Sequence, residues 1–445
     1  MPIAALPKYF DGISLATASP GLRFGMYLAL WGVDNRTRAA LWTTHDINYR
    51  VTGRDKQERA FNDENKTSAL NQATRLTVGD RKLIAALSDR QAALARPLEA
   101  SRELLPLDAV AVAPFTTGLG NEHPLENGFA FLNPYGVPYL PGSGVKGVLR
   151  QTCRELARGD WGGTHGWSEE NRYPLPANGA QMRNPRSGEL GRLSMLDVLF
   201  GRATESGESE HVRGVLSFWD VIPQPDANSR DVSLMVEIMT PHQGHYYQQN
   251  AQMGSTSPHD SGQPVPISFL TVPPGWRFAF HVRCDLARLA RIAPDLAENG
   301  RWKELLEHAF AHAFAWCGFG AKTAVGYGAM QVDERALAQR REQEQARLEA
   351  AAESKRLAKL SPVERSIADA LINKVDQGMR DSVFLVQQIQ AGRWTESETP
   401  EVAARIKSLM KDEKTWKENS AKPEKDKDFK RTQVVLKILR RGGHA

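Results

Sequence analysis

The sequence predicts an α+β protein with a ferredoxin-like core and an all-helical C-terminal region. Three observations lead to this prediction. Between residues 107 and 332, strand and helix patterns follow one another in the order β-α-β-β-α-β once a polar insertion is set aside. A glycine-rich loop precedes the last of these strands. From Asp333 onward the mixed pattern gives way to charged helical segments.

Charge is distributed unevenly along the 445 residues. Residues 333–445 hold 24 Lys and Arg against 19 Asp and Glu, which accounts for the whole net charge of +5. The first 332 residues carry 33 charges of each sign. Net charge therefore gives no argument that the main body of the protein binds nucleic acid.

The cysteines and the apolar segments indicate where the protein resides. Cys153, Cys284 and Cys317 lie far apart and form no C-x-x-C pair, which is typical of a reducing compartment and argues against a thiolate metal site. The first ten residues lack the pattern of a signal peptide. No stretch approaches the roughly 20 apolar residues of a membrane span. We therefore expect a cytoplasmic protein.

Residues 1–106 are predicted to form an N-terminal extension. Its clearest element is a helix from Arg81 to Arg96, in which leucines recur on one side and which Pro97 is expected to end. The core domain follows over residues 107–332. Its first strand is predicted from Leu107 to Phe115, where apolar and β-branched residues alternate with others.

A helix ending near Ala157 is the second core element, and Ser143 is its predicted N-cap. Lys146 and Arg150 are four residues apart and share one face near its start. A helix N-terminus with two cations beside it suits an anionic ligand. The alternative is a surface helix with two solvated cations, and the helix alone does not decide between them.

Two further core strands are predicted on either side of a long insertion. These strands span Val212 to Val221 and Trp276 to Arg283. The insertion, about residues 223–274, is polar and rich in Ser, Gly and Pro. Two runs within it, Val232 to Met239 and Ile267 to Val272, are predicted to be strands of their own.

The glycine-rich loop lies between a predicted helix, Arg301 to Trp316, and the last strand, Tyr327 to Val332. This order is the reverse of a dinucleotide-binding fingerprint, and the glycine spacing does not match a Walker A loop. One interpretation is a tight helix-to-strand connection. The other is a phosphate cradle in which Lys322 lies among free backbone N–H groups. That cradle would include Gly318, Gly320, Thr323, Gly326 and Tyr327.

Residues 333–445 are predicted to form a separate helical region. Its first helix, Asp333 to Leu360, is rich in Arg, Glu, Gln and Ala. A second helix begins at Ser361 with a capping-box pattern, and further helices follow. We do not expect this region to carry chemistry.

Three stretches together resemble the RAMP superfamily of CRISPR proteins. They are residues 117–128 together with 135–147, then 240–247, and finally the glycine-rich residues 318–328. Each motif is weak alone, but they occur in the expected order on a ferredoxin-like pattern. The resemblance covers roughly residues 107–332, and it is strongest to subunits of type III-B (Cmr) effector complexes.

The resemblance implies a modified RNA-recognition fold and a role in RNA binding. It implies a subunit near the 3′ end of a guide RNA, at the end of a helical filament of related subunits. Residues 223–274 would be the thumb that wedges against the guide–target duplex. In such complexes a different backbone subunit cuts the target RNA, so the resemblance implies a binding subunit and not the nuclease.

The polar insertion contains a group of histidines and tyrosines: His242, His245, Tyr246 and Tyr247. Three interpretations remain open for this group. The side chains could perform acid–base chemistry on RNA, they could stack on bases, or they could pack within a turn. The sequence shows no partnered base of the kind that catalysis needs.

A second histidine pair, His308 and His312, occupies positions i and i+4 of the helix before the glycine-rich loop. A metalloprotease pattern requires Glu after the first histidine, and this chain has Ala309 there. We interpret the pair as packing or partner-facing residues. No nucleophile-elbow or Ser-His-Asp pattern is evident.

The prediction from sequence is thus a non-catalytic subunit that binds guide RNA and takes part in antiviral defence. Its expected partners are guide crRNA, target RNA and other RAMP-type Cmr subunits, and no cofactor or metal is expected. The alternatives are a metal-independent endoribonuclease that processes CRISPR RNA and a module that only binds protein. The predicted RNA-binding residues are Lys146, Arg150, His242, His245, Tyr246, Tyr247, Gly318, Gly320, Lys322, Thr323, Gly326 and Tyr327.

Overall fold

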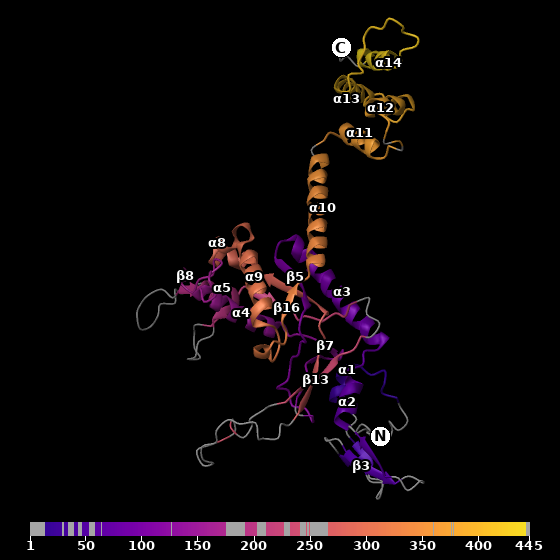
Figure 1. Ribbon diagram of the computed structural model, residues 1–445. Helices are drawn as coiled ribbons and strands as arrows, with labels where there is room; N and C mark the ends of the chain where they lie inside the picture. The colour runs from indigo at the N-terminus through magenta and orange to yellow at the C-terminus, as the bar shows by residue number, and fades with distance from the viewer. Residues whose placement is uncertain are drawn as a thin grey trace. The chain divides into compact units, whose positions relative to one another are not determined.

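The computed structural model divides the chain into two compact units, Met1–Leu337 and Ala338–Ala445. The ribbon in Figure 1 follows both along the chain. The residues that the structure describes are 14–28, 31–33, 40–42, 47–52, 58–63, 65–125, 127–174, 192–202, 211–226, 232–240, 246, 249, 266–358, 360–374, 376 and 378–441.

A four-stranded antiparallel sheet forms the centre of the first unit. Its strands, from edge to edge, are β12 (Leu216–Phe218), β15 (Arg277–Cys284), β5 (Leu104–Ala111) and β16 (Met330–Val332). The first strand in the chain therefore lies between the third and the fourth. In β15, Phe278, Phe280 and Val282 are buried at alternate positions and therefore face the same side of the sheet.

Two long helices, α4 (Gly142–Arg158) and α9 (Arg301–His312), connect these strands and pack against each other. Around the ring of Phe280 lie Phe310, Phe314 and Phe319, with ring centroids 5.3, 5.5 and 5.0 Å away. This aromatic cluster joins the sheet to α9 and to the start of the glycine-rich loop. The mixture of helix and sheet predicted from the sequence is confirmed.

The N-terminal part of the chain shares the core of the first unit. Leu70 and Ile84 belong to the same buried cluster as the sheet residues. The helix expected to end at Pro97 continues to Ala100, so that prediction was wrong. The proline removes one backbone hydrogen bond, but the helix tolerates it near its last turn. The elements here are α1 (Pro20–Gly25), β1 (Trp31–Val33), β2 (Ala40–Trp42), β3 (Ile47–Thr52), β4 (Glu58–Asp63), α2 (Asn65–Thr74) and α3 (Val78–Ala100).

Within the predicted insertion, β13 (Met235–Met239) and β14 (Ile267–Thr271) pair antiparallel, and we call this pair the hairpin. The strand expected over 212–221 is divided into two short strands, at residues 212–213 and 216–218, which belong to different sheets. A side chain at position 214, between them, would collide with the backbone of Leu199 and Phe200. The remaining elements of this unit are β6 (Phe131–Leu132), β7 (Val137–Pro138), β8 (Asn171–Pro174), β9 (Arg192–Ser194), α5 (Met195–Phe200), β10 (Gly201–Arg202), β11 (Val212–Arg213), α7 (Leu286–Ile292), α8 (Pro294–Ala297) and η2 (Glu298–Gly300).

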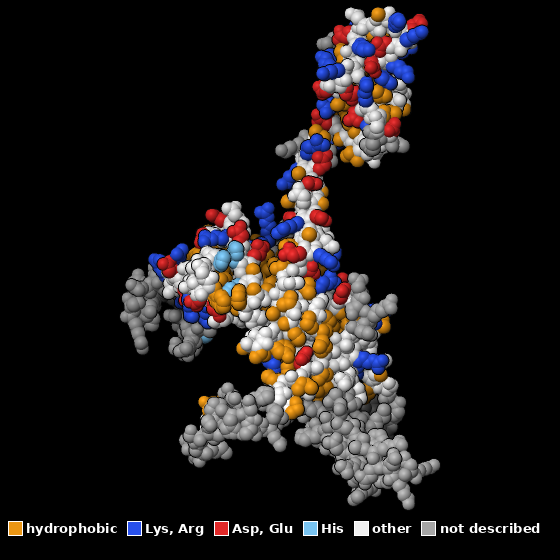
Figure 2. Space-filling model, in the orientation of Figure 1, with side chains coloured by type: hydrophobic (Ala, Val, Ile, Leu, Met, Phe, Trp, Pro, Cys, Tyr) orange, Lys and Arg blue, Asp and Glu red, His pale blue; other side chains and the backbone are white. Residues whose placement is uncertain are grey.

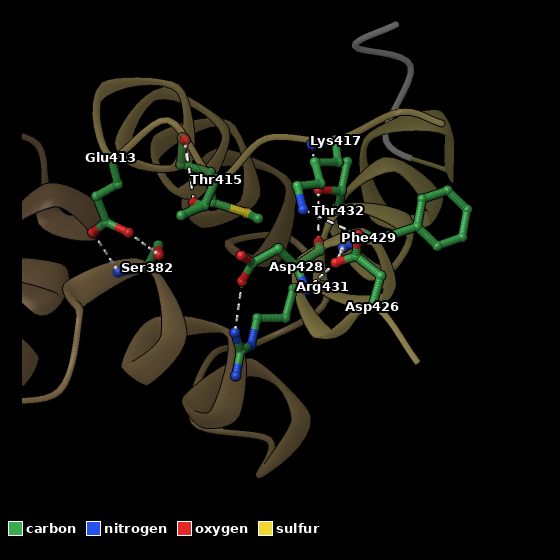
Figure 3. Close-up of polar contacts among 10 residues, drawn as sticks. Ser382, Glu413, Thr415, Lys417, Asp426, Asp428, Phe429, Arg431 and Thr432 are labelled. Carbon is green, nitrogen blue, oxygen red and sulfur yellow. Dashed lines mark hydrogen bonds and ion pairs between the residues drawn. The ribbon is translucent and has the colours of Figure 1, made fainter. Parts of the chain in front are cut away.

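The second unit is helical and has its own hydrophobic core, which includes Leu385, Ile406 and Val435. Polar contacts fix the turn before its last helix (Figure 3): Lys417 pairs with Asp426 at 3.0 Å. The helices are α10 (Glu334–Ala358), which begins at the end of the first unit, α11 (Pro362–Ile372), α12 (Asp381–Gln390), α13 (Thr399–Asp412) and α14 (Lys427–Arg441).

None of the helices in the described part of the chain combines the length and the apolar character that crossing a membrane requires.

We predict that the chain cut after Leu337 folds without the helical unit, because the two units have separate buried cores. The shortened protein should show one cooperative thermal transition and retain its far-UV signal for mixed helix and sheet. Calorimetry and circular dichroism would test this. A shortened protein that melts without cooperativity would show that the core needs the helices.

Candidate nucleic-acid interface

The N-terminus of α4 is built differently from the sequence prediction. The helix begins at Gly142, whose N–H donates a 2.7 Å hydrogen bond to Oδ1 of Asp220. Ser143 was predicted to be the N-cap, and this is wrong, because Ser143 lies exposed within the first turn. A side chain at position 142 would collide with the backbone of Phe218, so glycine lets the helix start against that strand.

The Asp220 carboxylate decides where an anion can bind near α4. Its negative charge already occupies the end of the helix axis, where the helix dipole would otherwise attract a phosphate. A second anion at the same point would be repelled. An anionic ligand is therefore expected beside the helix, on the face that carries Lys146 and Arg150.

That lateral face combines two free cations with an open stretch of backbone. Lys146 and Arg150 are half-buried, and among the described residues neither forms an ion pair. The Nε atom of Arg150 is buried and has no hydrogen-bond partner in the described part of the chain. Gly147 lies beside them, one turn before Arg150, and an added Cβ would meet no atom within 4 Å. We call Ser143, Lys146, Gly147 and Arg150 the α4 face.

Gly147 has no structural reason to be glycine. Its φ is not in the left-handed region, and no neighbour crowds it. Glycine in the middle of a helix costs about 1 kcal/mol relative to alanine. A glycine that lowers helix stability in this way is typical of a surface that another backbone approaches closely.

Several N–H groups of the glycine-rich loop are used in hydrogen bonds within the chain. The N–H of Gly318 donates to the carbonyl of Ala313 at 2.8 Å, and that of Gly326 donates to Thr323 at 3.0 Å. For Gly318 and Gly326, the expectation that glycine frees the N–H group for a ligand is therefore wrong. Gly318 and Gly320 adopt φ values of 69° and 93°, and both lie against neighbouring backbone.

Lys322 and Tyr327 point to the hairpin at the base of the insertion. Lys322 Nζ lies 3.4 Å from the sulfur of Met239 and 4.9 Å from the ring centroid of Phe269. The ring of Tyr327 also packs on Phe269, with centroids 5.7 Å apart. Burial, together with the carboxylate and hydrogen bond of Glu237, raises the pKa of Tyr327. These two side chains fasten the loop to β13 and β14.

The tip of the loop remains accessible. Val325 is 67% exposed, and Gly326 beside it is exposed with open space around its Cα. Thr323 is half-buried at the start of this tip. No hydrogen bond or ion pair of the described residues joins the tip to Lys146 or Arg150.

Of the histidine and tyrosine group in the insertion, the structure describes only Tyr246. Tyr246 is half-buried and interacts with neighbouring groups. His242, His245 and Tyr247 lie outside the described residues. Their predicted contact with RNA stays a prediction.

Sequence reasoning missed two features. One is the open space around Gly147 on the surface of α4, and the other is the packing of the glycine-rich loop on the hairpin. The first could have been noticed, because a glycine between two cations within a helix pattern is unusual. The second has no sequence signal, since Lys322 and Met239 are 83 residues apart.

The four-stranded sheet, the two packed helices and the glycine-rich loop can be compared with known protein families. The model of the RAMP superfamily matches residues 108–331, about half of the chain. The chain belongs to the RAMP superfamily, which confirms the resemblance predicted from its motifs. It is similar to the CRISPR system Cmr subunit Cmr6 of Pyrococcus furiosus, with 30% identity over 240 residues. The match covers 47% of this chain and 63% of that relative, so it spans less than two thirds of the relative's length.

Solved structures of CRISPR proteins also match. One is a cryo-EM structure of the type III-B Cmr-beta complex bound to cognate target RNA, with 15% identity, a TM-score of 0.36, and 60% of this chain and 70% of that chain covered. Another is the crystal structure of Cmr6 from Pyrococcus furiosus, with 26% identity and a TM-score of 0.25, covering 52% of this chain and 97% of that chain. A type IV-B CRISPR complex matches with 17% identity and a TM-score of 0.30, over 52% and 89% of the two chains.

We predict that Gly320→Ala destabilises the first unit more than Gly326→Ala. Both glycines have φ near 92°, so alanine at either position costs about 1–2 kcal/mol of backbone strain. Only at position 320 does the new Cβ also press on Thr116 and Phe115, which adds about 1–3 kcal/mol of overpacking. Urea unfolding of the two variants measures the difference. Equal losses would contradict the close approach of the loop to residues 115 and 116.

Proposed function

We propose that the chain is a non-catalytic subunit of a type III-B CRISPR (Cmr) effector complex and binds the guide crRNA near its 3′ end. Membership of the RAMP superfamily and the similarity to a Cmr subunit support this proposal. In this role it takes part in antiviral defence, with guide crRNA, target RNA and other RAMP-type Cmr subunits as partners.

The α4 face is the observation that carries the proposal. Lys146 and Arg150 offer positive charge that no carboxylate of the described chain neutralises. Arg150 also holds a buried N–H donor without a partner, a group that costs free energy until an acceptor reaches it. Beside the two, Gly147 lets a ligand backbone approach the helix. A sugar–phosphate backbone supplies both the charge and the acceptors that this face lacks.

The order of the sheet supports a ferredoxin-like core. The first strand lies between the third and fourth, and the second occupies the far edge, which is the arrangement that a β-α-β-β-α-β chain produces in that fold. Residues 223–274 would then be the thumb. We propose that Lys322 and Tyr327 serve chiefly to hold the base of this thumb, because both pack on its hairpin.

Contact with neighbouring subunits is supported by apolar side chains around the same hairpin. Ile238 on β13 is 62% exposed, and Met235 on the same strand is 39% exposed. Figure 2 shows hydrophobic side chains gathered over this part of the first unit, with few charged groups among them. Exposed apolar surface of this kind marks protein-binding sites.

We predict that Gly147→Ala makes the protein more stable but weaker in guide binding. Alanine should raise the free energy of unfolding by up to about 1 kcal/mol, because it favours the helix and meets no neighbour. The same methyl group should obstruct the RNA backbone. Thermal melting measures the first effect, and titration with guide RNA measures the second.

Lys146→Ala should weaken binding for all guide sequences alike and lower the slope of log affinity against log salt by about one unit. Arg291→Ala, which removes an exposed cation on α7, is the matched control and should change neither quantity. If Lys146→Ala behaved like this control and Gly147→Ala bound normally, the α4 face would not be the RNA site.

We predict that the isolated chain cleaves no RNA, with or without divalent metal. The double change His242→Ala and His245→Ala should leave target cutting by the assembled complex intact, because another subunit would supply that chemistry. Gel analysis of labelled RNA tests both statements. Discrete products from the isolated wild-type chain that disappear in the double variant would favour the alternative, a CRISPR-RNA-processing endoribonuclease.

A further inference from the structure

A group of three potential metal ligands lies within the described part of the first unit, at the contact between α4 and the end of α9. The group consists of Glu155 from α4 and of His312 and Cys317 from the end of α9. Their ligand atoms all lie within 4.8 Å of one another. His312 Nε2 is 3.6 Å from Glu155 Oε2, and Cys317 Sγ is 3.9 Å from the same oxygen.

A distorted helical turn brings the histidine and the cysteine together. Residues Ala313–Cys317 form a π-helical turn, in which the N–H of Gly318 donates to the carbonyl of Ala313 five residues earlier. In a regular α-helix, five residues make about 1.4 turns, so His312 and Cys317 would point in different directions. The wider turn aligns them toward Glu155. Such turns occur frequently at functional sites.

His312 provides an independent sign that a partner belongs at this point. Its side chain is only 9% exposed, and its Nε2 atom is buried without a hydrogen-bond partner in the described residues. The Glu155 oxygen, at 3.6 Å, lies beyond hydrogen-bonding distance. A buried nitrogen of this kind is costly unless something binds it.

Neighbouring side chains orient the other two ligands. Gln151 donates a 3.1 Å hydrogen bond to Oε1 of Glu155, which leaves Oε2 directed at His312 and Cys317. The hydroxyl of Thr152 lies 3.4 Å from the sulfur of Cys317. Partners that hold ligand atoms in place are typical of metal sites.

The alternative is a reactive cysteine. Burial raises the pKa of Cys317, and this effect and that of Glu155 outweigh the hydrogen bond from Thr152, which lowers it. The free thiol is therefore a poor nucleophile. The group does not have the character of a thiol activated for catalysis.

We propose that Glu155, His312 and Cys317 bind a zinc ion. Carboxylate oxygen, imidazole nitrogen and thiolate sulfur are all zinc ligands, and tetrahedral zinc places such atoms about 3.4–3.6 Å apart. Two of the observed separations, 3.6 and 3.9 Å, are close to these values. On binding, the Cys317 thiol releases its proton to solvent and the sulfur forms the zinc bond. The carboxylate and the thiolate then balance the 2+ charge, and the fourth position is left to water.

The site lies beside an exposed pair of aromatic rings. Trp161 contacts the edge of His312 with centroids 5.0 Å apart, and its ring is 5.1 Å from that of Trp316. These tryptophans are 49% and 65% exposed. Their fluorescence should report metal binding, because a paramagnetic ion at the three ligands would quench both.

The test uses the full-length protein, freed of metal by a chelator and titrated with Co²⁺. One ion per chain should bind, with a thiolate-to-cobalt charge-transfer band and quenched tryptophan emission, and Zn²⁺ should displace it. Cys317→Ser should abolish the band. His312→Gln and Glu155→Gln should weaken binding by at least about tenfold, a loss that even the outer partners of metal ligands cause.

The matched control is His308→Gln, which removes a neighbouring histidine on α9. His308 is exposed and stacks on His165, with ring centroids 4.8 Å apart, instead of joining the three ligands. This variant should bind Co²⁺ as the wild type does. Loss of the band in His308→Gln, or its retention in Cys317→Ser, would overturn the proposal.

A measurement on the wild type covers the case in which a variant fails to fold. Cys153 and Cys284 are buried, so a maleimide should label Cys317 first under native conditions. One equivalent of Zn²⁺ should protect Cys317 from labelling. Unchanged labelling in the presence of Zn²⁺, or the absence of any stoichiometric metal binding, would also overturn the proposal.

Discussion

The backbone of Pro114, Phe115 and Thr116, just beyond β5, is the junction on which the rest of the first unit depends. Phe115 exchanges two hydrogen bonds with Val272 after β14, at 2.9 and 2.7 Å. On the other side, the carbonyls of Pro114 and Thr116 accept the N–H groups of Gly328 and Ala321, both at 2.8 Å. The end of β5, the segment after β14 and the glycine-rich loop therefore meet at residues 114–116. Gly320 is required here because a side chain at this position would collide with the backbone of Thr116.

The contacts at this junction differ in kind from the surface that we propose to bind RNA. The loop, the hairpin and the end of β5 hold one another, and the side chains of Lys322 and Tyr327 contact the hairpin. The α4 face has the opposite character, since its cations and its open glycine have no counterpart among the described residues. A neutral main body can thus bind a polyanion through local charge, while its net charge gives no indication of this.

Two different groups of side chains lie along α4, and each belongs to a separate proposal. Near its start, α4 presents Lys146 and Arg150 at its surface. About one and a half turns later, Glu155 faces the π-helical turn after α9. The zinc proposal and the RNA proposal rest on different residues of the same helix. Failure of either leaves the other standing, because the three proposed metal ligands are not the side chains of the α4 face.

The sequence by itself determined the order of strands and helices, the family and the helical character of the last hundred or so residues, because these depend on local periodicity and on short motifs. It misplaced the cap of α4, because Asp220 bonds to the helix start from far along the chain. It also missed that the N–H groups of Ala321 and Gly328 bond to the carbonyls of Thr116 and Pro114, about 200 residues away. Only the tertiary structure showed that Gly318 and Gly320 pack against neighbouring backbone and that Gly147 has open space around it. It alone brought Glu155 to His312 and Cys317, across more than 150 residues. Contacts of this kind depend on the packing of whole elements, for which a single sequence holds no local signal.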